Sequence, residues 1–241
     1  MVSILIPVYN KEEWILETLH SVLNQTYDHW ECLIIDDGST DSSLPKIIEF
    51  TRNNPANWKI FSTVNSGQTA ARNYGIEQSE GELLAFLDAD DLWHPKKIET
   101  QVRTFDSQPE IQLVFMPYVI FRRNQKTGFR VIDHRNPQKL VKDWLNMRGF
   151  GGLIESTGMI RRKTLLEFGG FPMEFSMTAG LDLSLRVVQS THTALTSQPL
   201  VYYRLSDGQF HKNEEVLIKD LEFTSKLHTK TPAELLRLST Q

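Results

Sequence analysis

The stretch LLAFLDADDLWHP, residues 83–95, decides how the rest of the chain is interpreted. Its first five residues are apolar, and a short apolar run predicts a strand that is buried on both faces of a sheet. Asp88, Asp90 and Asp91 follow, and alternation along extended backbone predicts that Asp88 and Asp90 point the same way. Such close carboxylates repel unless they share a cation or a proton, and Mg2+ takes oxygen ligands of this kind. The alternative is a polar turn that leads into a helix near Pro95.

The preceding segments repeat one pattern, in which an apolar strand is followed by a polar cluster and an amphipathic helix. We expect strands at residues 2–7, 30–35, 58–63 and 83–87, and helices at residues 11–25, 42–52, 68–78 and 95–105. This alternation predicts right-handed crossovers and a mostly parallel α/β sheet with helices on both faces. Ligands bind outside the carboxyl ends of such strands, so the polar clusters should meet at one edge. The GxGxxG and GxxxxGK[ST] patterns are absent, which argues against a dinucleotide site and a P-loop.

The second half of the chain is less regular. We expect one long strand at residues 111–121, then a loop and the start of a helix over residues 122–142. Further elements are expected as helices at 162–168, 181–189 and 213–227, a strand at 200–205, and a last helix from 231. We therefore expect a single α/β domain at residues 1–206, with a nucleotide-binding half (1–95) and an acceptor half (96–206). A helical C-terminal extension is expected at residues 207–241.

Composition narrows the classes of partner. The 241 residues carry a formal net charge of -4, which gives no general attraction to nucleic acid. Cys32 is the only cysteine, so an intrachain disulfide is excluded and a reducing compartment is expected. No apolar run approaches the roughly 20 residues of a membrane-spanning helix, and no basic leader precedes the first apolar run. These features predict a cytoplasmic protein, with any membrane contact peripheral at the inner face.

Basic residues are concentrated in one segment, from Arg122 to Lys142. It holds seven Lys and Arg residues against Asp133 alone, a local charge of +6. A solvated surface is one interpretation of such a run. The other is a docking surface for an anionic acceptor or for lipid headgroups.

Seven segments, in this order and spacing, carry a resemblance to a known family. They are SILIPVYN (3–10), LETLHSVLNQTY (16–27), ECLIIDDGSTD (31–41), NSGQTAARNYGI (65–76), GELLAFLDADDLWHP (81–95), RRKTLLEFGGF (161–171) and DLSLR (182–186). Together they resemble the family 2 glycosyltransferases of the GT-A fold, and they cover nearly all of the chain up to Arg204. A metal-dependent phosphatase would instead place an aspartate nucleophile after the first strand, where Tyr9 and Asn10 stand.

The resemblance implies transfer of a sugar from a nucleotide-diphosphate donor to an acceptor hydroxyl, with inversion at the anomeric carbon. It implies a hexosyl- or hexosaminyltransferase of polysaccharide, O-antigen or other cell-surface glycan synthesis, with a glycan or lipid-linked acceptor and Mn2+ or Mg2+. The implied donor-binding residues are Pro7, Tyr9, Asn10, Asp37, Gly67, Arg72 and Asp88, and the implied metal ligands are Asp90 and Asp88. A UDP-sugar is the expected donor, although uracil, thymine and guanine all present a ring N–H that Asp37 could accept. Asp37 could instead serve the turn, and Arg72 could be a helix-surface residue.

The chain departs from the family at the catalytic base. Many members carry a Glu-Asp pair whose Asp is the base, and counting from GGF (169–171) places Ala179 and Gly180 there. Asp182 is the first candidate to replace it, provided that the chain is not yet helical, because helix positions two apart do not share a face. The alternative for Asp182 is an ion pair with Arg186, four residues on.

Two other outcomes remain open at this position. Another acid, such as Glu155 or Glu174, could serve as the base. Without any base, the chain would be a nucleotide-sugar-binding protein with little or no transferase activity. A second departure lies downstream, because the family often has His two residues after Tyr-Arg, whereas Ser206 stands there in this chain and His211 comes later.

Overall fold

The computed structural model describes residues 1–122, 125–130, 155–175 and 179–205. The predictions for residues 131–154, for the extension at 207–241 and for His211 lie outside this part of the chain.

A seven-stranded sheet forms the centre of the molecule, in the order β10-β6-β9-β4-β1-β2-β3. Its strands are β1 (Val2–Val8), β2 (Trp30–Asp36), β3 (Trp58–Ser62), β4 (Leu83–Phe86), β6 (Leu113–Phe115), β9 (Met159–Arg161) and β10 (Thr193–Leu195). The strand β1 pairs in parallel with both β2 and β4, and β2 pairs in parallel with β3. Only β9 runs antiparallel, between β4 and β6. The carboxyl ends of β1 to β4 therefore lie at the same edge.

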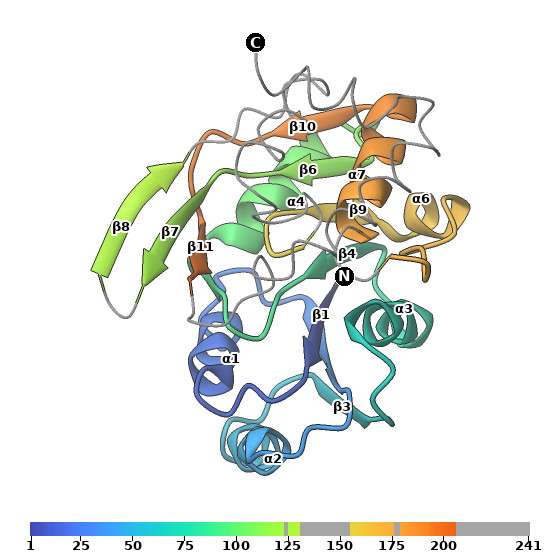
Figure 1. Ribbon diagram of the computed structural model, residues 1–241. Helices are drawn as coiled ribbons and strands as arrows, with labels where there is room; N and C mark the ends of the chain where they lie inside the picture. The colour runs from blue at the N-terminus through green and yellow to red at the C-terminus, as the bar shows by residue number, and fades with distance from the viewer. Residues whose placement is uncertain (123–124, 131–154, 176–178, 206–241) are drawn as a thin grey trace, which may run out of the picture.

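Helices cover both faces of this sheet (Figure 1). One face carries α1 (Ile15–Leu23), α2 (Ser43–Asn53) and α4 (Lys97–Ser107), and the other carries α3 (Gln68–Gln78), α6 (Arg162–Glu167) and α7 (Ala179–Ser190). The predicted α/β class, with a mostly parallel central sheet covered by helices on both faces, is confirmed. In the described part of the chain, no helix is both long enough and apolar enough to cross a bilayer.

The core explains why the central strands are largely apolar in sequence. Every residue of β1, β2 and β4 is buried, as expected for strands covered by helices on both faces. Gly75 lets α3 approach closely, because a Cβ there would lie 2.5 Å from Leu5 Cδ2 and 2.9 Å from Ile35 Cδ1. The site at the strand ends is therefore supported by a rigid, close-packed base.

Two expectations about the second half were wrong. Residues 111–121 do not form one strand, because β6 ends at Phe115 and β7 (Tyr118–Arg122) belongs to a second sheet. Pro117 lies at the break, where its missing N–H removes one ladder hydrogen bond. The second sheet has the order β5-β11-β7-β8, with β5 (Leu92–Trp93), β11 (Val201–Arg204) and β8 (Gln125–Arg130). Residues 125–130 are thus a strand and not the loop that was predicted.

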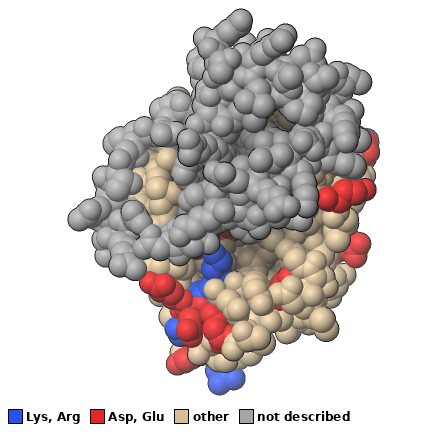
Figure 2. Space-filling view, viewed as in Figure 1, with Lys and Arg blue, Asp and Glu red and all other residues tan. Residues whose placement is uncertain are grey.

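The charged surface is mixed on the described part of the face in Figure 2. Acidic and basic side chains lie next to each other over the region of α1 and α2.

Candidate functional site

The loops after the first parallel strands contact one another through hydrogen bonds. The Asn10 side-chain oxygen, from the loop after β1, accepts from the Thr40 N–H at 2.8 Å in the loop after β2. The Lys11 N–H donates to Ser43 Oγ at 2.7 Å, and the Lys11 carbonyl accepts from the Trp14 and Ile15 N–H groups in a turn that leads into α1. Asn10 has a left-handed backbone, with φ of 51°, a conformation that asparagine tolerates. The expected meeting of polar clusters at one edge is confirmed for these loops.

Asp37 connects the loop after β2 to the loop before α3. Its two carboxylate oxygens accept hydrogen bonds from the Ser66 and Gly67 N–H groups, each at 2.8 Å. Gly67 begins the helix with φ of 91°, where a glycine is favoured. Asp37 therefore organises this loop, and its buried carboxylate lies where two loops meet.

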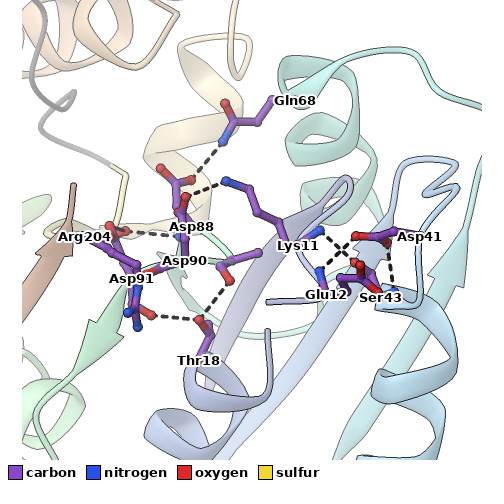
Figure 3. A network of polar contacts seen from close by, with 12 residues as sticks. Lys11, Glu12, Thr18, Asp41, Ser43, Gln68, Asp88, Asp90, Asp91 and Arg204 are labelled. Carbon is purple, nitrogen blue, oxygen red and sulfur yellow. Dashed lines mark hydrogen bonds and ion pairs between the residues drawn. The ribbon is translucent and has the colours of Figure 1, made fainter. Parts of the chain in front are cut away.

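The acid-rich segment after β4 folds into a turn. The Asp91 N–H donates to the Asp88 carbonyl at 3.0 Å, with residues 89 and 90 in the turn. The expected alternation of Asp88 and Asp90 along extended backbone is therefore wrong, and the two carboxylates have different partners (Figure 3). We call residues 88–91 the acid turn.

Each of the first two acids of the acid turn faces a cation. Asp88 accepts from the Arg72 guanidinium at 2.7 Å and from the Gln68 amide at 3.0 Å, both from α3. Asp90 pairs with the Lys11 ammonium at 2.5 Å. Burial disfavours the charged form of Lys11, but the carboxylates of Asp90, Asp88 and Asp91 outweigh it and raise the lysine pKa. Repulsion between neighbouring acids is thus offset by side chains from α3 and from the loop after β1.

Asp91 is a structural member of the turn. Both oxygens accept hydrogen bonds, from the Arg204 N–H at 2.9 Å and from the Ser156 hydroxyl at 2.6 Å. Burial, followed by the charges of Asp90 and Asp88, raises the pKa of Asp91 well above its usual value. With 1% of its surface exposed, Asp91 holds the turn and is not available to a ligand.

Backbone carbonyls of the acid turn are held as well. The Thr18 hydroxyl on α1 lies 3.0 Å from the Ala89 carbonyl and 2.9 Å from the Asp91 carbonyl. Arg204 Nε donates to the Asp90 carbonyl at 2.7 Å, and the guanidinium lies over the rings of Trp14 and Phe121.

Several site residues were missed from the sequence. They are Lys11, Thr18, Gln68 and Ser156, and Arg204 was noted only as a family marker. No local pattern identifies them, since each contacts the turn across a large sequence separation.

The other implied donor residues differ in accessibility. Tyr9 is exposed just after β1, whereas Pro7 is buried within that strand. Gly67 lies exposed at the start of α3, and Arg72 is buried on the same helix.

The carboxylates of the acid turn are suitable ligands for a divalent cation that a substrate also binds. Within the described residues, no cluster of three or more His, Cys, Asp or Glu side chains is arranged to hold a metal. Asp90, however, already binds a cationic group in Lys11, and Mg2+ typically takes one or two carboxylates plus substrate phosphates. The turn therefore suits an ion whose remaining ligands come from a diphosphate.

The condition for Asp182 as a base is not met. The helix α7 begins at Ala179, so Gly180 and Asp182 both lie on regular helix. Asp182 is buried and its carboxylate accepts from Arg186 Nε at 2.8 Å. Of the other acids, Glu174 is exposed, and Glu155 lies 3.6 Å from the Arg72 guanidinium.

Loops, glycines and acids thus gather at the carboxyl edge of a parallel α/β sheet, which is where such sheets bind ligands. Residues 3–168 match the model of glycosyl transferase family 2, which is more than half of the chain. The chain is 31% identical over 216 residues to the UDP-Glc:alpha-D-GlcNAc-diphosphoundecaprenol beta-1,3-glucosyltransferase WfgD of Escherichia coli, which covers 89% of this chain and 81% of WfgD. The chain therefore belongs to glycosyl transferase family 2.

Other relatives match a shorter part. The putative teichuronic acid biosynthesis glycosyltransferase TuaG of Bacillus subtilis is 38% identical over 102 residues, which is 42% of this chain and 40% of TuaG. The match to an uncharacterized glycosyltransferase of Rickettsia bellii spans only 14% of that protein.

Solved structures support the fold. S. aureus TarS 1-349 in complex with UDP-GlcNAc superposes with a TM-score of 0.75 at 20% identity, over 98% of this chain and 69% of TarS 1-349. The mannosyltransferase PcManGT from Pyrobaculum calidifontis, in complex with GDP-Man and Mn2+, gives a TM-score of 0.71 at 16% identity, over 99% of this chain and 68% of PcManGT.

Proposed function

We propose that the chain is an inverting glycosyltransferase that moves a hexosyl or hexosaminyl group from a UDP-sugar to an acceptor hydroxyl. The proposed acceptor is a glycan or a lipid-linked saccharide in cell-surface polysaccharide or O-antigen synthesis. The observation that carries the proposal is the acid turn, fixed at the carboxyl end of β4 beside the loops that hold Asp37 and Gly67. Two similar proteins support a UDP-sugar as the donor. WfgD is named for a UDP-Glc donor, and TarS 1-349 was solved in complex with UDP-GlcNAc.

We propose for the donor residues the roles that the family resemblance implies. Asp37 is proposed to accept a hydrogen bond from the ring N–H of the nucleobase. It can do so in addition to its present partners, because a carboxylate oxygen can accept more than one hydrogen bond. Arg72 is proposed to face the diphosphate, and Asp88 the ribose and sugar side. The loop residues proposed to line the nucleotide are Pro7, Tyr9, Asn10 and Gly67.

Asp90, together with Asp88, would hold Mn2+ or Mg2+. The ion would supply positive charge for the diphosphate leaving group. The role of the chain's own residues is to fix the turn: Thr18, Ser156 and Arg204 hold its backbone and Asp91, so Asp90 is presented in one orientation.

A donor screen tests this function. Thermal unfolding with Mn2+ and each of UDP-Glc, UDP-GlcNAc and GDP-Man should show one class of donor that stabilises the chain. A ligand at 100 times its Kd adds about 2.7 kcal/mol, which corresponds to roughly 5 to 10 °C for a protein of this size. The stabilising donor should then be consumed in hydrolysis and transfer assays. No stabilisation by any nucleotide-sugar would contradict the proposed function.

A second candidate function is favoured by Gly180. A nucleotide-sugar-binding protein of the same fold would show the same stabilisation but neither hydrolysis nor transfer of the donor. The two functions are therefore separated by turnover, not by binding.

For the segment from Arg122 to Lys142 we propose peripheral contact with an anionic membrane or acceptor at the inner face of the membrane. Replacing Arg130, Arg135 and Lys139 with serine should weaken binding to liposomes of anionic phospholipid. Each basic residue near such a surface contributes about 1 kcal/mol, so the loss should approach 100-fold at low salt and shrink as salt is added. Donor binding should be unchanged. Equal liposome binding by parent and triple variant would leave only a solvated surface.

A further inference from the structure

We propose that Glu155 is the catalytic base of this transferase and that Gly180 is the residue that makes room for it. The inference rests on the proposed function, since a base is needed only if a sugar is transferred. The family motif places the base at position 180. The proposal places it instead in the segment just before β9.

The space beside Gly180 is filled by the Glu155 carboxylate. A Cβ built on Gly180 would lie 2.5 Å from Glu155 Cδ and 2.9 Å from Oε2, and it would meet Oε1 as well. Real Cβ atoms do not approach other atoms so closely, so any side chain at position 180 would displace Glu155. A carboxylate is therefore present beside position 180, but it comes from another segment of the chain.

Glu155 also lies beside the proposed donor site. The Arg72 guanidinium bridges two acids, with Asp88 at 2.7 Å and Glu155 at 3.6 Å. The next residue, Ser156, accepts from the Asp88 N–H at 3.1 Å and donates to Asp91, and its carbonyl accepts from Trp93 Nε1 at 2.8 Å. The backbone that carries Glu155 is thus fixed to the acid turn, which is how a base is positioned relative to a donor.

Two of the three acids that were candidates from sequence, Asp182 and Glu155, differ in what surrounds them. The Asp182 side chain is 2% exposed and pairs with Arg186 at 2.8 Å. The Arg186 guanidinium also donates to the Phe168 carbonyl at 2.6 Å. The Glu155 side chain is 12% exposed, and its ion pair with Arg72 is the longer of the two. The Glu155 carboxylate is thus sheltered, with Oε2 buried and part of the side chain exposed, whereas Asp182 is committed to anchoring α7.

In the proposed step, the acceptor hydroxyl oxygen forms a bond to the anomeric carbon of the donor sugar. Its proton passes to the Glu155 carboxylate as the bond from the anomeric carbon to the phosphate oxygen breaks. The electron pair of that bond leaves with the nucleoside diphosphate. The carboxylate form, which pairs with an arginine, is also the form that accepts a proton.

The first test is removal of the base. With the donor and acceptor found in the screen, Glu155→Gln should lower kcat by about 100-fold or more, because a positioned base is typically worth 10² to 10⁴-fold. Donor Kd, measured by calorimetry, should stay within a few-fold of the parent. Glu155→Asp, which keeps a carboxylate on a shorter side chain, should retain more turnover than Glu155→Gln. Glu49→Gln, at an exposed acid on α2, is the matched control and should turn over like the parent.

The second test moves the carboxylate. Gly180→Asp alone should lower transfer, because its side chain collides with Glu155. The double variant Glu155→Ala with Gly180→Asp should exceed Glu155→Ala by at least about 10-fold, since it returns one carboxylate to the same space. Thermal unfolding of each variant separates loss of fold from loss of chemistry.

Each contrary result has a distinct meaning. If Glu155→Gln keeps kcat within a few-fold, or if Gly180→Asp alone raises transfer, Glu155 is not the base. A 100-fold loss in Asp182→Asn with intact donor binding assigns the base to Asp182 instead. A parent that binds a donor but transfers nothing overturns the proposed function itself, and the Glu155 proposal with it.

Discussion

Replacing Arg204 with methionine is expected to lower the free energy of unfolding by about 3 to 5 kcal/mol. Arg204 is 1% exposed and is the last residue of β11. Its guanidinium donates to the buried Asp90 carbonyl at 2.7 Å and to Glu17 at 2.8 Å. A buried carbonyl left without its donor costs about 1 to 3 kcal/mol. Loss of the cation–π contacts with Trp14 and Phe121, which together are worth about 2 kcal/mol, adds to this cost.

The measurements are denaturant unfolding and thermal unfolding of the parent, Arg204→Met and Arg204→Lys. The melting temperature of the methionine variant should fall by on the order of 10 °C. Lysine keeps the charge but lacks the planar guanidinium that reaches two acceptors. The stability of Arg204→Lys should therefore lie between those of the parent and Arg204→Met. Arg52→Met, at an exposed arginine on α2, should unfold like the parent. Parent-like stability of Arg204→Met would show that the acid turn is held by its other contacts alone.

The first half of the fold could be predicted because its signals are local. Each strand there is a short apolar run and each helix is amphipathic, so α3 was placed at its observed bounds, Gln68–Gln78. The sheet edge that gathers the polar loops follows from parallel pairing alone. The predicted division into two halves does not correspond to two separate sheets. The strands β6, β9 and β10 from the second half extend the central sheet formed by the first half.

Other features depended on contacts that a sequence does not display. Pro117 breaks an apolar run between strands of different sheets, and its effect was overlooked because the run looked continuous. The acid turn could not be distinguished from extended backbone, because its shape is set by Thr18 and Arg204, which lie far away in sequence.

The base position shows the same limit in a sharper form. Gly180 is compatible with helix or loop, so the start of α7 at Ala179 could not be fixed from its sequence. The contact between Gly180 and Glu155 joins two segments whose register no motif records. Glu155 could therefore be named from sequence only as one of several acids.

Replacing Asp90 with alanine is expected to weaken binding of UDP in the presence of Mn2+ by about 100-fold. Charge stabilisation by a bound metal is worth several kcal/mol, and each 1.4 kcal/mol is tenfold in affinity. In the proposed site Asp90 is the main protein ligand of the ion, and its side chain is already oriented by the acid turn. EDTA should therefore weaken UDP binding to the parent by a similar factor and change little for Asp90→Ala.

Calorimetric titration of UDP and GDP with Mn2+, and again with EDTA, measures both effects. Asp106→Ala, at an exposed acid on α4, is the matched control and should bind like the parent. Equal affinity of the parent with Mn2+ and with EDTA, or an Asp90→Ala protein that binds as tightly as the parent, would refute the metal site.

The Lys11–Asp90 pair gives this prediction a second, opposite arm. The Lys11 ammonium lies 2.5 Å from the Asp90 carboxylate, so a divalent ion must displace the ammonium in order to bind Asp90. Removing the competitor in Lys11→Met should therefore tighten binding of Mn2+ alone, measured by electron paramagnetic resonance, by roughly two- to five-fold, the worth of a partly exposed ion pair. Lys163→Met, at an exposed lysine on α6, should leave Mn2+ binding as it is in the parent. If Lys11→Met weakens Mn2+ binding instead, Asp90 needs the lysine beside it and does not bind the ion in its place.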